Sequence, residues 1–365
     1  MISESPSIVA LSPEHSELVA AFSRPKVLGF GQLMAPIMAV ANYHDGAWGE
    51  ASLSPYQGIV FDPAAKSLHY GQQVFEGMKA FALEGGGCAL FRPELNWARF
   101  NASATRMAMP SIPRDLFMQA VESLVHHLGP IVPRGRGESL YLRPIMLATE
   151  AGLSLKPSNT YLFMVIASPS GGYFSAAKVT ALVERCDARA APGGTGAYKV
   201  AGNYGASIRG DMKAAQFNCQ QTLWLDALQK SHIEEFSGMN FFAVVDSQLV
   251  TPPVSETILR GVTRDSIVAL ARHLGLAVDE RPILVNELLE QIEGGRCTEI
   301  FACGTAAVIT PVHALREENG KTFELPPVEA SMSLRLREML LDIQTGRRPG
   351  PEGWVRRVNA GSYLN

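Results

Sequence analysis

The sequence has 365 residues, of which 47% are hydrophobic and 18% charged, a composition typical of a globular protein with a sizeable core. Its 32 basic and 35 acidic side chains give a formal net charge of −3, so neither a nucleic-acid-binding surface nor a charged tail is expected. No apolar run reaches the roughly 18 residues of a membrane span, so none is expected.

The cysteines are odd in number and irregular in spacing, and they contain no CxxC pair; they are Cys88, Cys186, Cys219, Cys297 and Cys303. Neither a disulfide framework nor a metal site is therefore expected, and a reducing compartment fits best. The first residues, MISESPSIVALSPEHSELVAAF, place acidic side chains early and no basic segment before an apolar core. They do not resemble a secretory or transit peptide, and we expect a cytoplasmic protein.

Composition shifts along the chain predict two domains. Residues 1–24 are rich in Ser, Pro and Glu, and we expect a flexible N-terminal segment there. Apolar runs alternate with helical patterns over residues 25–168, ending in a predicted buried strand, TYLFMVIAS. A Gly, Ser and Pro cluster predicts a linker at 169–178. Residues 179–365 form a second domain with strands at ALVE, NFFAVVD and TEIFACGTAAVIT, so we predict a mixed α+β or α/β fold.

A helix is predicted over residues 96–109, NWARFNASATRMAM, which stops before a proline. Arg99, Ser103 and Arg106 share one face of this helix. An arginine on a helix of small residues can reach a buried anion, because guanidinium matches phosphate oxygens bidentately. Arginines that lie along the surface are the alternative.

A strand is predicted at LYLRPIML, residues 140–147, whose period of two places Tyr141 and Arg143 on one face. A phenol beside a guanidinium could hold a carboxylate. From this stretch alone, two solvent-facing side chains are equally compatible with the pattern.

A glycine-rich stretch, GGTGAYKVAGNYGAS at residues 193–207, has Lys199 near its middle. It is not a Walker motif, because valine and not serine or threonine follows the lysine. No acidic residue occurs over residues 188–210, so a buried Lys199 would lack a local counter-ion and favour the neutral amine. A neutral amine is a nucleophile toward aldehydes, whereas a solvated loop lysine is the alternative.

Two later stretches offer groups that could bind a phosphorylated pyridine. IEEFSGMNFF, residues 233–242, places a carboxylate before a tight Ser-Gly turn, and a carboxylate keeps a pyridine nitrogen protonated. A helix is predicted over residues 263–274, with Thr263 as its N-cap, and its free N–H groups could bind an anion. An ordinary capped helix is the alternative. With Lys199, these features fit pyridoxal 5'-phosphate.

Seven motifs in order make the chain resemble the branched-chain amino acid aminotransferases, which are class IV (fold type IV) pyridoxal-phosphate enzymes. They are YGQQVFEGMKAF, LFRPELNWARF, YLRPIMLATE, GGTGAYKVAGNYG, EEFSGMNFF, TPPVSETILRGVTRDS and ACGTAAVITPV. The resemblance covers roughly residues 25–360 and implies a two-domain fold like that of D-amino acid aminotransferase, with the cofactor at the domain interface.

The resemblance also implies roles for cofactor-binding residues. Lys199 would bond covalently to the cofactor and move the substrate proton, Tyr204 would hydrogen-bond the cofactor's phenolic oxygen, and Glu235 would pair with its pyridine nitrogen. The phosphate would be bound by Arg99, by the N–H groups of Val262 and Thr263, and by Thr305. Arg106 remains a surface arginine in this interpretation.

For the substrate, the resemblance implies that Tyr141 and the Thr305–Ala306 backbone hold the α-carboxylate, and that Arg143 admits the distal carboxylate of glutamate. An apolar pocket would be lined by Phe30, Phe75, Tyr173 and Gly238. Further residues would reach in from the second subunit of a homodimer: Tyr70, Leu153 and Leu155.

The implied reaction moves the amino group of L-leucine, L-isoleucine or L-valine reversibly to 2-oxoglutarate. Two departures stand out: Ala307 and Thr310 occupy the places of a CxxC redox switch found in some relatives, and Gly238 replaces a threonine. The alternatives are a D-amino acid aminotransferase or aminodeoxychorismate lyase, which would keep Lys199 and Glu235, and a non-catalytic cofactor carrier.

Overall fold

The structure is a computed structural model that describes residues 6–171, 178–327 and 331–359. The chain divides into two compact units: unit 1 is Met1–Tyr173 with Leu341–Asn365, and unit 2 is Phe174–Leu340. The predicted linker at 169–178 spans the passage from one unit to the other. Its Tyr173 lies outside the described residues.

Unit 1 is built on a nine-stranded antiparallel sheet in the order β19-β6-β5-β7-β8-β1-β2, with β3 paired to β1 and β4 paired to β7. The strands are β1 (Ile37–His44), β2 (Ala47–Trp48), β3 (Ser52–Pro55), β4 (Gln73–Phe75), β5 (Met78–Ala82), β6 (Cys88–Phe91), β7 (Ser139–Ala148), β8 (Tyr161–Ser170) and β19 (Val355–Val358).

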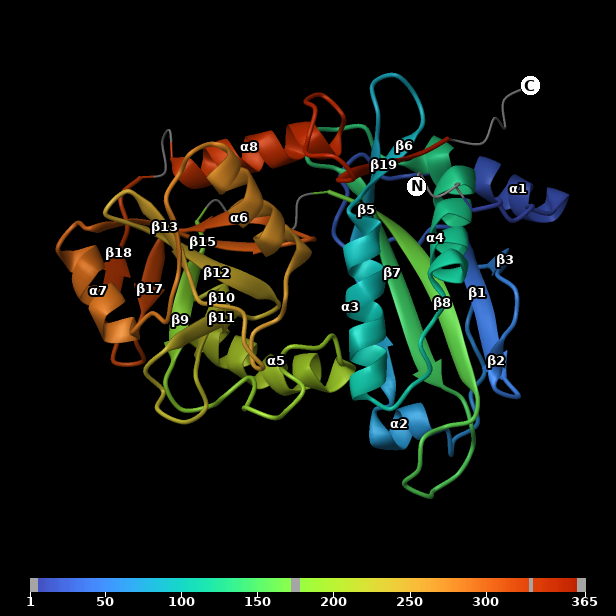
Figure 1. Ribbon diagram of the computed structural model, residues 1–365, viewed down its shortest axis with the longest axis horizontal. Helices are drawn as coiled ribbons and strands as arrows, with labels where there is room; N and C mark the ends of the chain where they lie inside the picture. The colour runs from blue at the N-terminus through green and yellow to red at the C-terminus, as the bar shows by residue number, and fades with distance from the viewer. Residues whose placement is uncertain (1–5, 172–177, 328–330, 360–365) are drawn as a thin grey trace. The chain divides into compact units, whose positions relative to one another are not determined.

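The helices of unit 1 are α1 (Pro13–Ala20), α2 (Lys66–Tyr70), α3 (Pro93–Arg106), α4 (Arg114–Leu128) and a short 3-10 helix, Gly129–Ile131. In Figure 1, α3 and α4 lie across the sheet. The apolar face of α4 packs on β1 and β8, where the Phe117 ring lies 5.7 Å from the rings of Phe100 and Phe163. This packing removes three aromatic side chains from water and fixes α4 on β8, the strand that pairs with β7.

Two expectations about the chain ends need correction. Within the N-terminal segment expected to be flexible, α1 forms, because Pro13 occupies its first turn and the Ser12 hydroxyl accepts a hydrogen bond from the His15 N–H at 3.2 Å. The end of the chain, assigned to the second domain, returns to unit 1, where β19 pairs with β6 and Arg356 binds Glu122 at 2.5 Å. Such non-local pairing leaves no local periodicity in the sequence.

Unit 2 contains a ten-stranded mixed sheet in the order β14-β13-β12-β11-β10-β9-β17-β18, with β15 paired to β12 and to β16. The strands are β9 (Thr180–Glu184), β10 (Gln221–Leu225), β11 (Ile233–Phe236), β12 (Met239–Val245), β13 (Gln248–Thr251), β14 (Val278–Glu280), β15 (Cys297–Gly304), β16 (Val308–Val312), β17 (Ala314–Arg316) and β18 (Thr322–Glu324).

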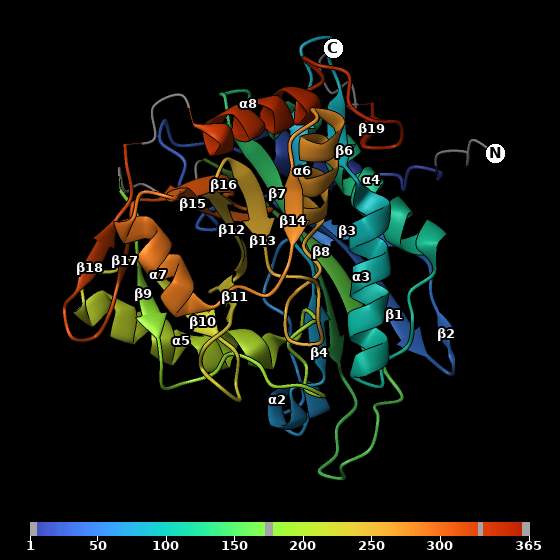
Figure 2. The same ribbon diagram turned by 60° about the vertical axis from the view of Figure 1, so that its left-hand side comes forward.

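The helices of unit 2 are α5 (Ala201–Gln216), α6 (Val262–His273) and α7 (Val285–Glu293), and α8 (Met332–Gln344) begins there and continues into residues of unit 1. Figure 2 shows α5 running beside β9 and β10, with which it is in contact. None of the helices in the described ranges has the length and apolar character that a membrane span requires.

Most predicted elements are confirmed, with shifted ends. The strands at 140–147, 160–168 and 240–246 appear as β7, β8 and β12, and TEIFACGTAAVIT forms the antiparallel pair β15 and β16. The helix expected at 96–109 begins and ends three residues earlier, because Pro93 starts it and Ala108 has a left-handed φ of 53°. The predicted N-cap Thr263 is wrong: Gly261 caps α6 and Thr263 lies inside the helix.

The core of unit 2 has a pair of stacked aromatic rings between neighbouring strands. Phe242 of β12 and Phe301 of β15 are register partners, and their ring centroids lie 5.1 Å apart with planes 6° from parallel. Both side chains are fully buried.

We expect Phe301→Ala to lower the free energy of unfolding by about 3–5 kcal/mol, because it removes buried apolar surface and leaves a cavity beside Phe242. Urea unfolding followed by circular dichroism measures the change. Leu228→Ala is the control, since that side chain is exposed, and should change the stability by less than about 0.5 kcal/mol. Equal losses in both variants would contradict the proposed core packing.

Candidate active site

Lys199 lies in unit 2, immediately before α5. The side chain is buried, and its Nζ donates a hydrogen bond to the Tyr204 hydroxyl at 2.9 Å. Tyr204 lies in the first turn of α5, so the second half of the glycine-rich stretch is helical. The structure therefore brings together the predicted catalytic lysine and the tyrosine predicted to bind the cofactor's phenolic oxygen.

The loop before Lys199 is fixed by close backbone contacts. A Cβ atom on Gly196 would lie 2.4 Å from the Ala190 Cβ and 2.8 Å from the Thr257 carbonyl oxygen, so only glycine fits there. The Asn203 side chain donates to the Thr195 and Tyr198 carbonyl oxygens at 2.8 and 2.9 Å. These hydrogen bonds from α5 therefore fix the backbone that leads to Lys199.

Glu235 lies on β11 and is buried. Its carboxylate accepts hydrogen bonds from the Asn240 side chain at 3.0 Å and the Leu259 N–H at 3.2 Å, and Arg189 Nη2 lies 2.7 Å from Oε1. Burial raises the pKa of Glu235 to about 7, and the charge of Arg189 opposes this rise. Such a carboxyl group is suited to pairing with a cationic partner.

The β11–β12 hairpin explains how Glu235 is placed. Glu235 and Asn240 are register partners, and the tight turn predicted between their strands contains Gly238, whose φ is +70°. Sequence reasoning missed Arg189. Its signal was its place in the same acid-free stretch as Lys199, where an arginine also lacks a local partner.

The other predicted groups of unit 2 lie at the start of α6 and after β15. Val262 and Thr263 form the first turn of α6, and no side chain of the described residues caps their N–H groups. Thr305 and Ala306 follow β15 in the turn before β16. The helix α6 contacts β15. Free N–H groups at a helix start can bind a phosphate.

In unit 1 the structure brings four predicted substrate residues together. Arg143 Nη2 donates to the Tyr141 hydroxyl at 3.2 Å, and its guanidinium lies over the Phe75 ring, 4.7 Å from the centroid. The Phe30 ring meets Tyr141 edge-on at 4.8 Å. A Cβ atom on Gly77 would lie 2.1 Å from the Tyr141 hydroxyl oxygen, so this position also requires glycine.

Arg99 on α3 is paired with Glu76, a residue that sequence reasoning missed. Arg99 Nε and Nη2 lie 2.6 and 2.9 Å from the two carboxylate oxygens of Glu76, which is fully buried and also accepts from Asn96. The signal for Glu76 was its place in the FEGMKAF motif. Arg106, interpreted as a surface residue, is exposed.

Three predicted residues lie on the surface of unit 1. The Tyr70 hydroxyl donates to the Leu153 carbonyl oxygen, while the side chains of Leu153 and Leu155 are 71% and 82% exposed. An ion pair of 2.8 Å between the buried Lys66 and the partly exposed Glu150 holds the base of their loop. The loop therefore presents apolar side chains from a fixed base.

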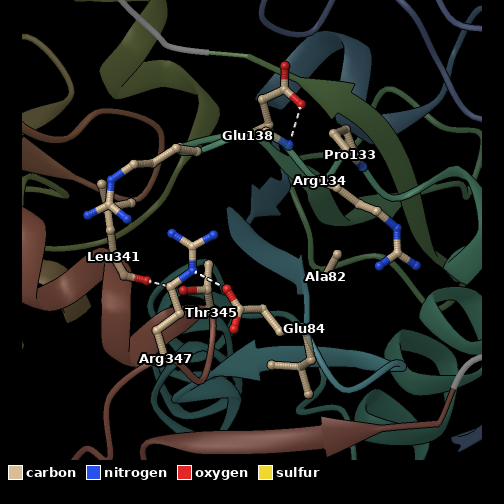
Figure 3. Close-up of a pocket in the computed structure, with 12 residues that line it drawn as sticks. Ala82, Glu84, Pro133, Arg134, Glu138, Leu341, Thr345 and Arg347 are labelled. Carbon is tan, nitrogen blue, oxygen red and sulfur yellow. Dashed lines mark hydrogen bonds and ion pairs between the residues drawn. The ribbon is translucent and has the colours of Figure 1, made fainter.

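Two other polar clusters contain none of the predicted site residues. Figure 3 shows a hollow in unit 1 where Arg347 pairs with Glu84 at 2.8 Å. In unit 2, potential metal ligands meet at Glu184, Cys186 and Glu318, but the Lys213 ammonium lies 2.9 Å from Glu184 and 2.5 Å from Glu318. An ion-pair network accounts for this second cluster.

The raised pKa of Glu235 predicts a pH dependence of stability in the cofactor-free protein. The folded chain binds a proton that the unfolded chain releases between about pH 4.5 and pH 7, so the free energy of unfolding falls as pH rises through this window. In wild type this fall in the free energy of unfolding should be on the order of 3 kcal/mol, and we expect it to be absent in Glu235→Gln. Urea unfolding at several pH values measures it, with exposed Glu324→Gln as the control. Parallel curves for wild type and Glu235→Gln would contradict the burial argument.

Comparisons with known proteins identify the family of the chain. Residues 73–315 match the family described as "Amino-transferase class IV". A "Probable branched-chain-amino-acid aminotransferase" of Streptomyces coelicolor is 42% identical over 94% of this chain and 95% of its own. A "Branched-chain-amino-acid aminotransferase" of Mycolicibacterium smegmatis is also 42% identical, over 91% of this chain and 92% of its own.

Solved structures show the same fold. The branched-chain aminotransferase of Thermoproteus uzoniensis with norvaline has a TM-score of 0.71 and 26% identity, covering 88% of this chain and 99% of its own. Another branched-chain amino acid aminotransferase, solved in complex with N-(5'-phosphopyridoxyl)-L-glutamate, has a TM-score of 0.68 and 30% identity, with the same coverage. The chain belongs to the class IV aminotransferases, which are fold type IV pyridoxal-phosphate enzymes, and within them to the branched-chain-amino-acid aminotransferase family.

Proposed function

We propose that this protein transfers the amino group of L-leucine, L-isoleucine or L-valine to 2-oxoglutarate, reversibly and with pyridoxal 5'-phosphate. The observation that carries this is the 2.9 Å hydrogen bond between Lys199 Nζ and the Tyr204 hydroxyl, in the same unit as a buried carboxylate, Glu235. The names of the relatives support the substrate class.

Each part of the cofactor would be bound by a different group of these residues. Glu235 would accept the pyridine N–H, Tyr204 would donate to the phenolic oxygen, and Lys199 would bond to the aldehyde carbon. The phosphate would be bound by positive charge and N–H groups, from Arg99, Val262, Thr263 and Thr305. When bound, the protonated ring supplies an electron sink for the charge that develops on the substrate Cα.

Lys199 has two tasks in this proposal. Its Nζ would be released when the amino acid takes its place, and the free amine would then move the proton from the substrate Cα to the cofactor. The Tyr204 hydroxyl, which Nζ contacts at 2.9 Å, orients the amine. Because Lys199 lies immediately before α5, its amine would stay within reach of that proton during the reaction.

The substrate is proposed to bind beside Tyr141 and Arg143 of β7. Tyr141 would bind the α-carboxylate with the backbone of Thr305 and Ala306, and Arg143 would pair with the distal carboxylate of glutamate. The remaining wall is proposed to be apolar and to accept branched side chains; it would comprise Phe30, Phe75, Tyr173 and Gly238. An apolar wall discriminates one methylene by only about 1–3 kcal/mol, so all three branched amino acids should react.

We also propose a cytoplasmic homodimer in which Tyr70, Leu153 and Leu155 complete the partner's substrate site. The support is the exposure of the two leucines on a loop with a fixed base, since exposed apolar patches mark interfaces. Five free cysteines support a reducing compartment.

The purified protein loaded with pyridoxal 5'-phosphate tests the function. Addition of L-leucine should shift the absorbance of the bound cofactor from the pyridoxal to the pyridoxamine form, and 2-oxoglutarate should restore it. We expect Lys199→Ala to bind the cofactor and to lose at least about 1,000-fold in turnover, because the base is gone.

Exposed Lys321→Ala, in the same chain but outside the proposed site, is the control and should cycle like wild type. A wild type that binds the cofactor without cycling would indicate a carrier. A preference for D-amino acids would favour the D-amino acid aminotransferase alternative.

The dimer has its own test. We expect wild type to sediment as a dimer and Leu153→Asp/Leu155→Asp to raise the monomer fraction and the KM for L-leucine, because two charges replace apolar contacts. Sedimentation velocity and steady-state kinetics measure both. Leu228→Asp, at another exposed leucine, is the matched control. A wild-type monomer with full activity would overturn the shared site.

A further inference from the structure

Arg189 is the point where three segments around Glu235 meet. Its side chain is 7% exposed, and Nη2 lies 2.7 Å from Glu235 Oε1 and donates to the Gly196 carbonyl oxygen at 3.1 Å. The same nitrogen donates to the Thr257 carbonyl oxygen. One guanidinium thus joins the carboxylate on β11, the loop that ends in Lys199 and the segment that leads to α6.

The charged groups around Glu235 act in different directions. Arg189 and Lys199 favour the carboxylate, whereas burial and the neighbouring Glu234 favour the protonated acid. Cys303 also faces Glu235, but burial raises the pKa of this thiol far above neutrality, so it stays uncharged. Arg189 is therefore the cation that directly contacts Glu235 among the described residues.

We propose that Arg189 is a positioning residue that keeps Glu235 anionic, so that the shared proton resides on the cofactor's pyridine nitrogen, and that it anchors the Lys199 loop. The inference rests on the proposed function for the role of Glu235. A buried carboxylate facing a pyridine can hold the shared proton on oxygen or on nitrogen. The guanidinium at 2.7 Å stabilises the charged carboxylate and shifts the proton to nitrogen.

Thr257 extends this arrangement to the neighbouring acid. Its hydroxyl donates to Glu234 at 2.5 Å while its carbonyl oxygen accepts from Arg189. Glu234 is thus held on a hydroxyl, whereas the direct ion pair of the guanidinium is with Glu235. Its own pKa is raised by burial, which limits its negative charge beside Glu235.

The test uses full-length protein loaded with pyridoxal 5'-phosphate labelled with ¹⁵N in the ring, because the nitrogen chemical shift reports whether the ring carries a proton. We expect Arg189→Gln to lose the ring proton at a pH at least about one unit below wild type, a tenfold change in the equilibrium. Arg189→Lys keeps a charge without the planar fork and should lie between them. Arg185→Gln, which removes a surface arginine paired with Glu317, should titrate like wild type.

A second readout needs no cofactor and separates this inference from the proposed function. In the cofactor-free chain, the infrared band of the protonated Glu235 carboxyl should persist to a pH about one unit higher in Arg189→Gln, and Glu235→Gln identifies the band by removing it. If wild type bound no cofactor, the proposed function would fail and this readout would still decide on Arg189. Unchanged titrations in Arg189→Gln and Arg189→Lys, by either method, would overturn the inference.

Discussion

The buried ion pair between Arg189 and Glu235 is the constraint on which the candidate site depends. Two charges removed from water are stabilised only when the geometry is close and the remaining oxygen atoms also receive donors. Here the pair is 2.7 Å apart, and Asn240 and Leu259 supply donors to the second carboxylate oxygen. The β11–β12 hairpin, the lysine loop and the approach to α6 are consequently fixed relative to one another.

Unit 1 also contains a buried pair of an arginine and a glutamate, but here the arginine is the group proposed to bind the cofactor. Arg99, proposed to bind phosphate, is held by the fully buried Glu76 through two nitrogens. Asn96, one turn earlier on α3, donates to the same carboxylate. In both units a buried carboxylate and an arginine orient each other. In unit 2 the carboxylate is proposed to contact the cofactor, whereas in unit 1 the arginine is.

The sequence predicts what is local. Alternating apolar residues predicted the strand that carries Tyr141 and Arg143, and family motifs predicted roles for Lys199, Tyr204 and Glu235, because motif order follows the chain. It did not reveal Arg189 and Glu76 as partners, since each contacts a residue distant in sequence. The N-cap at Thr263 failed for a related reason: α6 is capped by Gly261, where a Cβ atom would lie 2.0 Å from Oδ1 of Asn240, a residue distant in sequence.

Arg143 shows how one proposed pocket can accept both an aliphatic and an anionic side chain. Its guanidinium lies over the Phe75 ring and donates a hydrogen bond to the Tyr141 hydroxyl, so part of its donor set is already satisfied. A guanidinium is weakly hydrated on its faces and polar at its edge. A leucine side chain can therefore pack near it without stripping water from a strongly hydrated ion, while a glutamate carboxylate can bind the remaining N–H groups. A lysine at this position would offer a compact, strongly hydrated charge and lose the first of these two abilities.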